Sequence, residues 1–262
     1  MKRVAALFAA CLICFAVLAQ SSLAPVTVSA MGDPVEKSYR RMLRGMDLFE
    51  RMHARAPGAH LRYKLLPRKP GTPLEDIHLA VIGHTFSYPV PVVADHTFTL
   101  TRDERALAED AVVSPERRRL TMTWRTDIRT PGLPPATRRL GDLRLECLVG
   151  IEAGLVSNTN PLMQAVRSLL EDAATYCGRR NSKYLFFADR PIFSVTLVAG
   201  ARREVMPIDQ LYAGASDDPG LKADLPFCDC EMLVDRTYFL PLGDESWPDD
   251  TLVQFEWMQD AP

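Results

Sequence analysis

Residues 95–100 read Asp-His-Thr-Phe-Thr-Leu, and their pattern is typical of much of the chain. Phe98 and Leu100 alternate with threonines, which is the two-residue period of a strand with one buried face and one solvated face. Short strands separated by proline and glycine turns predict antiparallel sheets and favour β-sandwich modules. The same period recurs at 61–65, 77–81, 120–124 and 143–147, and further strand-like segments lie at 184–187, 193–198, 233–240 and 252–257.

The opening segment has a counterpart near the C-terminus, Asp-Arg-Thr-Tyr-Phe-Leu at residues 235–240. Other matches keep the same order along the chain, which predicts two β-modules of the same kind. These matches pair residues 109–113 with 249–253, and residues 78–83 with 195–200.

One module also resembles a known family. A strand, a glycine turn, Pro89-Val90-Pro91-Val92 and then Asp-x-x-Phe-x-Leu from Asp95 follow one another. This order resembles the carboxypeptidase-regulatory-like, transthyretin-type β-sandwich of exported bacterial proteins, over about residues 76–126, with a repeat at 193–258. The family commonly has glycine directly after the aspartate, where His96 and Arg236 stand in this chain. The resemblance implies a non-catalytic accessory or adhesive module.

Two segments have the pattern of helices. Asp33 is a suitable N-cap and Pro34 suits the first helical position, which predicts a helix over residues 34–56. Pro161 begins a second predicted helix, over residues 161–176, that Gly178 terminates. We therefore expect a mainly β chain of the α+β class with two packed helices. The expected domains are a helix plus the first module at 33–150 and a helix plus the second module at 151–262.

The first 30 residues have the composition of a secretory signal. Lys2 and Arg3 precede an uncharged apolar run that is too short to span a bilayer comfortably, and small residues favour cleavage after Ala19 or Ala30. The alternative is an uncleaved N-terminal anchor. We expect a periplasmic or secreted protein with no membrane span after removal of the signal. The formal net charge of −2, with both signs mixed along the chain, argues against a nucleic-acid-binding protein.

Four cysteines follow the apolar run, and an even number in an exported chain predicts disulfides. They are Cys147, Cys177, Cys228 and Cys230. A bridge within Cys228-Asp229-Cys230 is awkward to close. We therefore expect Cys228 and Cys230 each to pair with Cys147 or Cys177. A zinc site is the alternative, although Cys-x-Cys fits its usual spacing poorly.

No common motif for a nucleophile, a phosphate loop or a metalloprotease is present in the sequence. His78, His84 and His96 belong to one expected module and form the candidate metal site, since neutral imidazoles bind zinc or copper. The alternative is three solvated surface histidines. No cofactor is expected.

The sequence therefore favours an exported, non-catalytic envelope accessory or binding protein, with a protein or glycan of the cell envelope as its partner. Loops on rigid scaffolds commonly carry recognition, so the candidate contact residues are Pro131, Leu133, Pro134 and Trp247. The alternatives are a metal-binding protein and a periplasmic hydrolase. A hydrolase would use paired carboxylates, such as Asp217-Asp218 or the acidic residues around Trp247.

Overall fold

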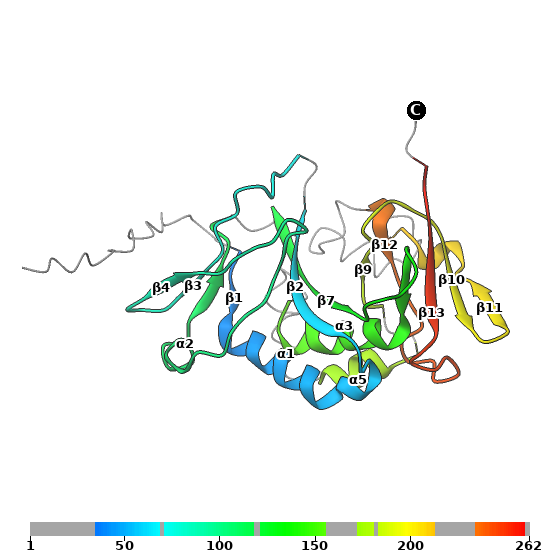
Figure 1. The fold of residues 1–262 in the computed structure, drawn as a ribbon, viewed down its shortest axis with the longest axis horizontal. Helices are drawn as coiled ribbons and strands as arrows, with labels where there is room; N and C mark the ends of the chain where they lie inside the picture. The colour runs from blue at the N-terminus through cyan, green and yellow to red at the C-terminus, as the bar shows by residue number, and fades with distance from the viewer. Residues whose placement is uncertain are drawn as a thin grey trace, which may run out of the picture.

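The computed structural model describes residues 35–68, 71–117, 121–155, 172–180, 183–212 and 234–259. This part of the chain is mainly β, with antiparallel sheets, and the expected α+β class is confirmed. Its helices are α1 (Tyr39–Met52), α2 (Glu104–Ala108), α3 (Leu140–Glu152) and α5 (Ala173–Gly178), with 3-10 turns η1 (His53–Arg55), η2 (Ile208–Gln210) and η6 (Val234–Arg236). In Figure 1, α1, α3 and α5 lie along the lower side of the molecule, and β2 and β7 lie between the sheets at its two ends.

The strands are β1 (Lys37–Ser38), β2 (His60–Pro67), β3 (Ala80–Ile82), β4 (Ser87–Pro89), β5 (Thr97–Phe98), β6 (Val112–Ser114), β7 (Met122–Arg129), β8 (Thr137–Arg139), β9 (Phe186–Phe187), β10 (Ile192–Ala199), β11 (Arg202–Val205), β12 (Thr237–Tyr238) and β13 (Leu252–Trp257). Four sheets contain them. The two four-stranded sheets have the orders β1-β6-β3-β4 and β8-β13-β10-β11, and the smaller sheets have the orders β5-β2-β7 and β12-β9.

The same order of connections occurs two times among the described strands. A short strand, β1 or β8, leads directly into a long helix, α1 or α3. The next strand, β2 or β9, pairs with β5 or β12 in a small sheet, while the hairpin β3–β4 or β10–β11 joins β6 or β13 in the larger sheet. β7 is the additional strand between the two copies. The predicted division between residues 150 and 151 lies within α3, whereas the connectivity begins again at β8.

The strand registers of the two copies also correspond. Val81 lies opposite Val113 in one copy and Leu197 lies opposite Val253 in the other, and all four are fully buried. The structure therefore makes Val81 equivalent to Leu197. The sequence match aligned Val81 with Val198, which is one residue too far along the chain. The reason is the hairpin loop: residues 83–86 connect β3 to β4, whereas residues 200–201 connect β10 to β11.

Helix α1 begins later than the sequence predicts. Lys37 and Ser38 pair with β6 as β1, so the chain is extended until the helix starts at Tyr39. The side chain of Ser38 is the N-cap, because its Oγ accepts a hydrogen bond from the Arg41 amide at 3.3 Å. The expected N-cap Asp33 lies outside the described residues, and the helix does not begin at 34 as predicted.

Residues 143–147 form part of α3, so the predicted strand there is wrong. The residues of α3 from Leu140 to Gly150 are all buried, because α1, α5 and β7 pack around the helix. A helix that is buried on all sides has no polar stripe to reveal the helical period. The sequence alternates between apolar and charged residues at 143–147. The charged residues Arg144 and Glu146 can occupy buried positions because both have polar partners inside the protein.

The predicted helix at 161–176 falls largely outside the described residues. Asp172 is extended and its side chain accepts the Thr175 amide at 2.6 Å, so it is the N-cap of a new helix, α5. A continuous helix through residue 172 is therefore wrong. α5 packs against α3, and the disulfide between Cys147 and Cys177 joins the two helices.

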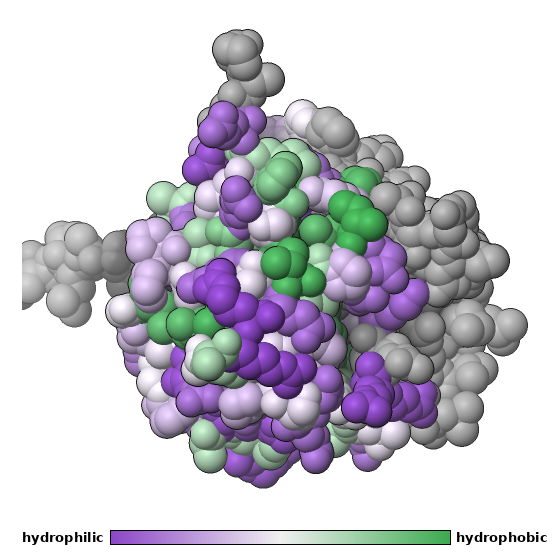
Figure 2. Space-filling model, turned by 90° about the vertical axis from the view of Figure 1, so that its right-hand side faces the viewer, coloured by the Kyte–Doolittle hydropathy of each residue, from purple (hydrophilic) through white to green (hydrophobic). Residues whose placement is uncertain are grey.

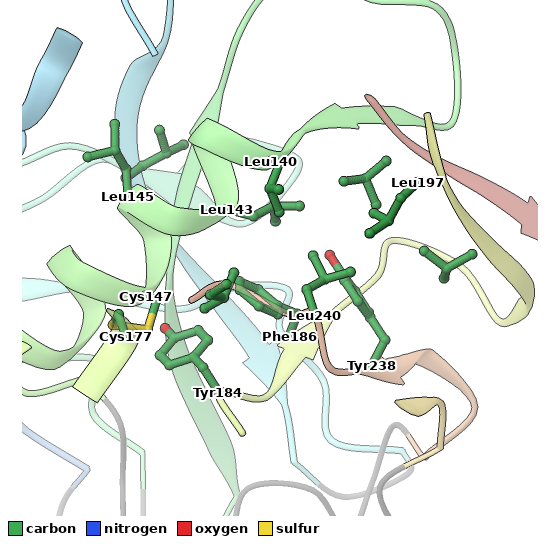
Figure 3. Close-up of a cluster of buried hydrophobic side chains, with 14 of the residues drawn as sticks. Leu140, Leu143, Leu145, Cys147, Cys177, Tyr184, Phe186, Leu197, Tyr238 and Leu240 are labelled. Carbon is green, nitrogen blue, oxygen red and sulfur yellow. A yellow bond between two sulfur atoms is a disulfide. The ribbon is translucent and has the colours of Figure 1, made fainter. Parts of the chain in front are cut away.

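Close packing of helices and strands forms the core. A Cβ atom at Gly45 would lie 2.8 Å from the Cβ of Ala153, so glycine allows α1 and α3 to approach closely. Figure 3 shows one buried cluster, in which Leu140 and Leu143 of α3 face Tyr238 and Leu240. Burial of each such leucine contributes about 1.5–3 kcal/mol to folding. In the described ranges, no helix has both the length and the apolar character needed to cross a membrane.

Candidate functional site

A groove of about 340 Å³ lies between helices and a loop. The end of α1 with η1 forms one wall, α3 and α5 form the floor, and the segment 242–249 forms the opposite wall. Cavities of this volume are typical of small-molecule sites. Its apolar lining includes Met52, Leu148, Ala174, Cys177, Leu242 and Trp247, and its charged lining consists of Arg55, Arg144, Glu245 and Asp249.

Arg144 fixes the loop wall of the groove. Its Nη1 lies 2.5 Å from Oδ1 of Asp249, and its Nε donates to the carbonyl oxygen of Leu242 at 2.9 Å. Its Nη2 donates to the carbonyl oxygens of Asp244 and Trp247, each at 2.9 Å. Every nitrogen of this buried guanidinium is therefore used. Charge-assisted bonds to a carboxylate and three carbonyls hold the segment in one position.

Trp247, one of the predicted contact residues, is buried. Its side chain is 1% exposed and lines the groove, and the guanidinium carbon of Arg202 lies 3.5 Å from the ring centroid. A cation placed over an indole face is a favourable contact. Trp247 therefore has two roles in the wall, since its ring packs beneath Arg202 and its carbonyl accepts from Arg144.

The disulfide lies beside the groove. Cys177 of α5 lines the groove and is bonded to Cys147 of α3, with their Cα atoms 6.0 Å apart. The prediction that these cysteines form disulfides is confirmed, but the preferred pairing with Cys228 or Cys230 is wrong for both of them. The reason is that α5 packs directly on α3. Cys228 and Cys230 lie outside the described residues.

Two charged groups near the groove differ from Arg144 in how fully they are paired. Nη1 of Arg55 is 3.4 Å from both carboxylate oxygens of Asp249, a long contact, and the Arg55 side chain is 40% exposed. Glu245 is exposed and lines the same groove. The groove therefore presents one weakly paired cation and one exposed carboxylate next to a firmly held ion pair.

A second set of charges lies between β7 and β9, around a cavity of only about 30 Å³. Arg138 and Glu146 form a buried ion pair there, with 2.5 Å between Nη2 and Oε1. Asp189 joins the two sheets because it accepts from Lys64 at 3.0 Å and pairs with Arg129 at 2.9 Å. A cavity of this size holds about one water molecule. We interpret this cluster as the polar contact between the two halves.

The pKa values in this cluster follow from its pairing. Burial acts to raise the pKa of Asp127, but three arginines outweigh burial and keep the pKa below its ordinary value. These arginines are Arg129, Arg138 and Arg62. Burial raises the pKa of Glu146, and Arg138 opposes the effect only in part. Both carboxylates are committed to cations within the protein.

The structure does not bring the candidate metal ligands together. His78 and His84 are exposed and His96 is half-buried. No group of three or more histidine, cysteine, aspartate or glutamate side chains is placed to hold a metal ion within the described ranges. The structure therefore gives no support to the predicted histidine site: His78 lies just before β3, His84 in the β3–β4 hairpin and His96 just before β5.

The remaining predicted residues lie as follows. Pro131 and Pro134 are exposed and Leu133 is half-buried in the loop between β7 and β8, and their role in contact stays a prediction. Hydrogen bonds from Ser246 lower the pKa of Asp244, which does not suit a proton donor. The pair Asp217-Asp218 lies outside the described residues.

The described surface at the β11 end of the molecule is mixed in character. Figure 2 shows this side, where hydrophobic side chains form small groups among hydrophilic ones. Phe193 on β10, Val205 on β11 and the nearby Ile208 are exposed. β11 is an edge strand, and its Arg202, Arg203 and Glu204 are the kind of charged residues that discourage pairing with another chain.

Sequence reasoning missed Arg144 and Arg55. Arg144 stood in an expected strand as a solvated residue, and its partner Asp249 is 105 residues away. No local pattern indicates such a contact. Comparison of the chain with protein-family models, with curated proteins and with solved structures finds no match. The resemblance of residues 76–126 to the transthyretin-type module therefore stays a prediction.

Proposed function

We propose that this chain is an exported, non-catalytic binding protein that takes a small molecule into the groove between α3, α5 and the 242–249 segment. The main observation in support is that contacts within the protein already hold the groove in shape without a ligand. Arg144 holds one wall through four hydrogen bonds, and the Cys147–Cys177 disulfide joins the two helices of the floor. A site that is already ordered loses little conformational freedom when a ligand binds.

The charges of the groove support binding more than proton transfer. Arg55 and Arg144 stay protonated in proteins, so neither can act as an acid or a base. Asp249 contacts both arginines. The export signal and the disulfide support a periplasmic or secreted location, since structural disulfides persist in oxidising compartments. The finer expectation of two sandwich modules of the transthyretin type belongs to this proposal.

The test is a titration of the mature oxidised chain, beginning at Met31, with a panel of small polar and amphipathic molecules. Thermal shift detects binding and calorimetry measures it. Ala174 lines the groove, so Ala174→Trp should fill it and abolish binding. Thr175→Trp changes a neighbouring exposed residue that does not line the groove and should retain binding. Binding that survives Ala174→Trp, or no binding at all, would overturn the proposal.

A further inference from the structure

The groove contains one cation whose hydrogen-bonding capacity is largely unused. Arg144 uses all three nitrogens within the protein. Arg55, by contrast, contacts Asp249 through Nη1 alone, at 3.4 Å. Within the described part of the chain, its Nε and Nη2 donate to no other group. A guanidinium has five N–H donors in a fixed plane, so most of the donors of Arg55 remain available to a ligand.

The groove also contains a carboxylate that has no partner among the described residues. Glu245 lines the groove and is exposed, and its carboxylate makes no hydrogen bond or ion pair with the described residues. Asp249 differs, because Arg144 lies 2.5 Å from one of its oxygens. The groove therefore offers one cation and one anion to a ligand, while its other two charges satisfy each other.

Apolar side chains line the same groove as these two charged groups. Met52 at the end of α1 and Leu148 on α3 line the groove together with Trp247 of the loop. Exclusion of water by such side chains strengthens the charge-assisted hydrogen bonds that a bound ligand makes. The chemistry thus favours a ligand with an apolar body and with charges of both signs.

Resting on the proposed function, we infer that the groove binds a small zwitterion of the amino-acid type with an apolar side chain. Its carboxylate accepts hydrogen bonds from Nε and Nη2 of Arg55, and its ammonium group pairs with Glu245. A ligand with only a negative charge would leave Glu245 as an unfavourable like charge. A ligand with only a positive charge would be repelled by Arg55 for the same reason.

The test compares three probes by calorimetry: phenylalanine, 3-phenylpropionate, which lacks the ammonium group, and phenethylamine, which lacks the carboxylate. A charge-assisted hydrogen bond contributes enough that the zwitterion should bind about tenfold or more tightly than either analogue. In Arg55→Ala the preference for phenylalanine over phenethylamine should fall to about one. In Glu245→Gln the preference over 3-phenylpropionate should disappear, while the other preference remains.

Arg51→Ala is the matched control, because Arg51 is exposed on the last turn of α1 and does not line the groove. It should leave all three affinities unchanged. Equal binding of the three probes, preferences that survive both variants, or no binding of any probe would overturn the inference. If other molecules still bind in a manner that Ala174→Trp abolishes, the proposed function stands and only the ligand class is wrong.

Discussion

Arg144 and Asp249 lie 105 residues apart in the sequence, and Nη1 of the arginine is 2.5 Å from Oδ1 of the aspartate. The pair connects α3 to the last loop of the chain. Since Arg144 also donates to three backbone carbonyls, its removal would leave four acceptors without this donor. The contact therefore serves the fold and the shape of the groove together.

Arg144→Ala should lower the free energy of unfolding by about 2–4 kcal/mol, because it leaves three carbonyl oxygens and a partly buried carboxylate without their charged donor. Urea denaturation followed by tryptophan fluorescence measures this loss, and Trp247 is one of the three tryptophans that contribute to the signal. Arg55→Ala is the control, because its contact with Asp249 is long and partly exposed, and it should cost about 1 kcal/mol or less. Equal losses in the two variants would show that Arg144 is not the fixed element of the wall.

The disulfide between α3 and α5 should contribute to stability because it closes a loop of 30 residues. Replacement of both Cys147 and Cys177 by alanine should lower the free energy of unfolding by about 2–4 kcal/mol. A dithiol reductant should reproduce the loss in the wild-type protein but have no further effect on the double variant. A wild-type unfolding curve that the reductant leaves unchanged would argue against a formed bridge.

The sequence predicts the strands of this protein better than its helices. Alternation correctly indicated β2, which has one buried and one more exposed face. It also indicated the start of β7, where apolar residues alternate with threonines although both faces of the strand are buried. It failed at residues 143–147, where α3 is buried on all sides and its charged residues find partners inside the protein. The helical period of α3 could not be recognised because solvent contacts no side of most of this helix.

The candidate site was less predictable than the fold. Trp247 was selected as a loop aromatic, but its burial depends on Arg202 and on the arginine of a distant helix. The histidines were grouped because they are near each other in the sequence, yet they lie on separate segments, before β3, in the β3–β4 hairpin and before β5. Contacts between residues far apart in the sequence decide both outcomes. The local patterns of a single sequence do not reveal such contacts.

The contact between the two halves should weaken in acid. Burial acts to raise the pKa of Asp189, but Arg129 and Lys64 outweigh it and lower the pKa below its ordinary value of 3.8. A carboxylate with a depressed pKa stabilises the folded state above pH 3.8, and this stabilisation is lost as the pH falls through its folded-state pKa. Asp189→Asn should therefore cost stability near neutral pH and much less below pH 3.

The expected cost at neutral pH is about 1 kcal/mol, because the side chain is 45% exposed and solvent screens its ion pairs. Urea unfolding between pH 2.5 and 7 measures the difference between variant and wild type. Asp209→Asn, at an exposed site on η2, provides the control and should show little difference at any pH. A constant difference for Asp189→Asn across this range would contradict the ionic explanation.

The two copies differ in a way that glycine substitution can test. His96 and Arg236 occupy equivalent positions: Leu65 donates its amide to the carbonyl of His96, and Ala188 donates its amide to the carbonyl of Arg236. His96 has a φ of +61°, whereas Arg236 lies in a 3-10 turn and is not among the residues of positive φ. A side chain at positive φ costs about 1–2 kcal/mol, which glycine avoids.

His96→Gly should therefore preserve the free energy of unfolding or raise it by up to about 1 kcal/mol, since relief of strain opposes the greater flexibility of the unfolded chain. Arg236→Gly has no strain to relieve and should lower it by about 0.5–1 kcal/mol. Both backbone hydrogen bonds remain available in the variants, but Arg236→Gly also removes the hydrogen bond from Nη1 of Arg236 to the carbonyl oxygen of Asp189 at 3.1 Å. Arg236→Ala, which removes the same side-chain bond without the flexibility of glycine, is therefore the reference for Arg236→Gly. Equal losses in both variants would mean that the left-handed turn at His96 is absent in solution.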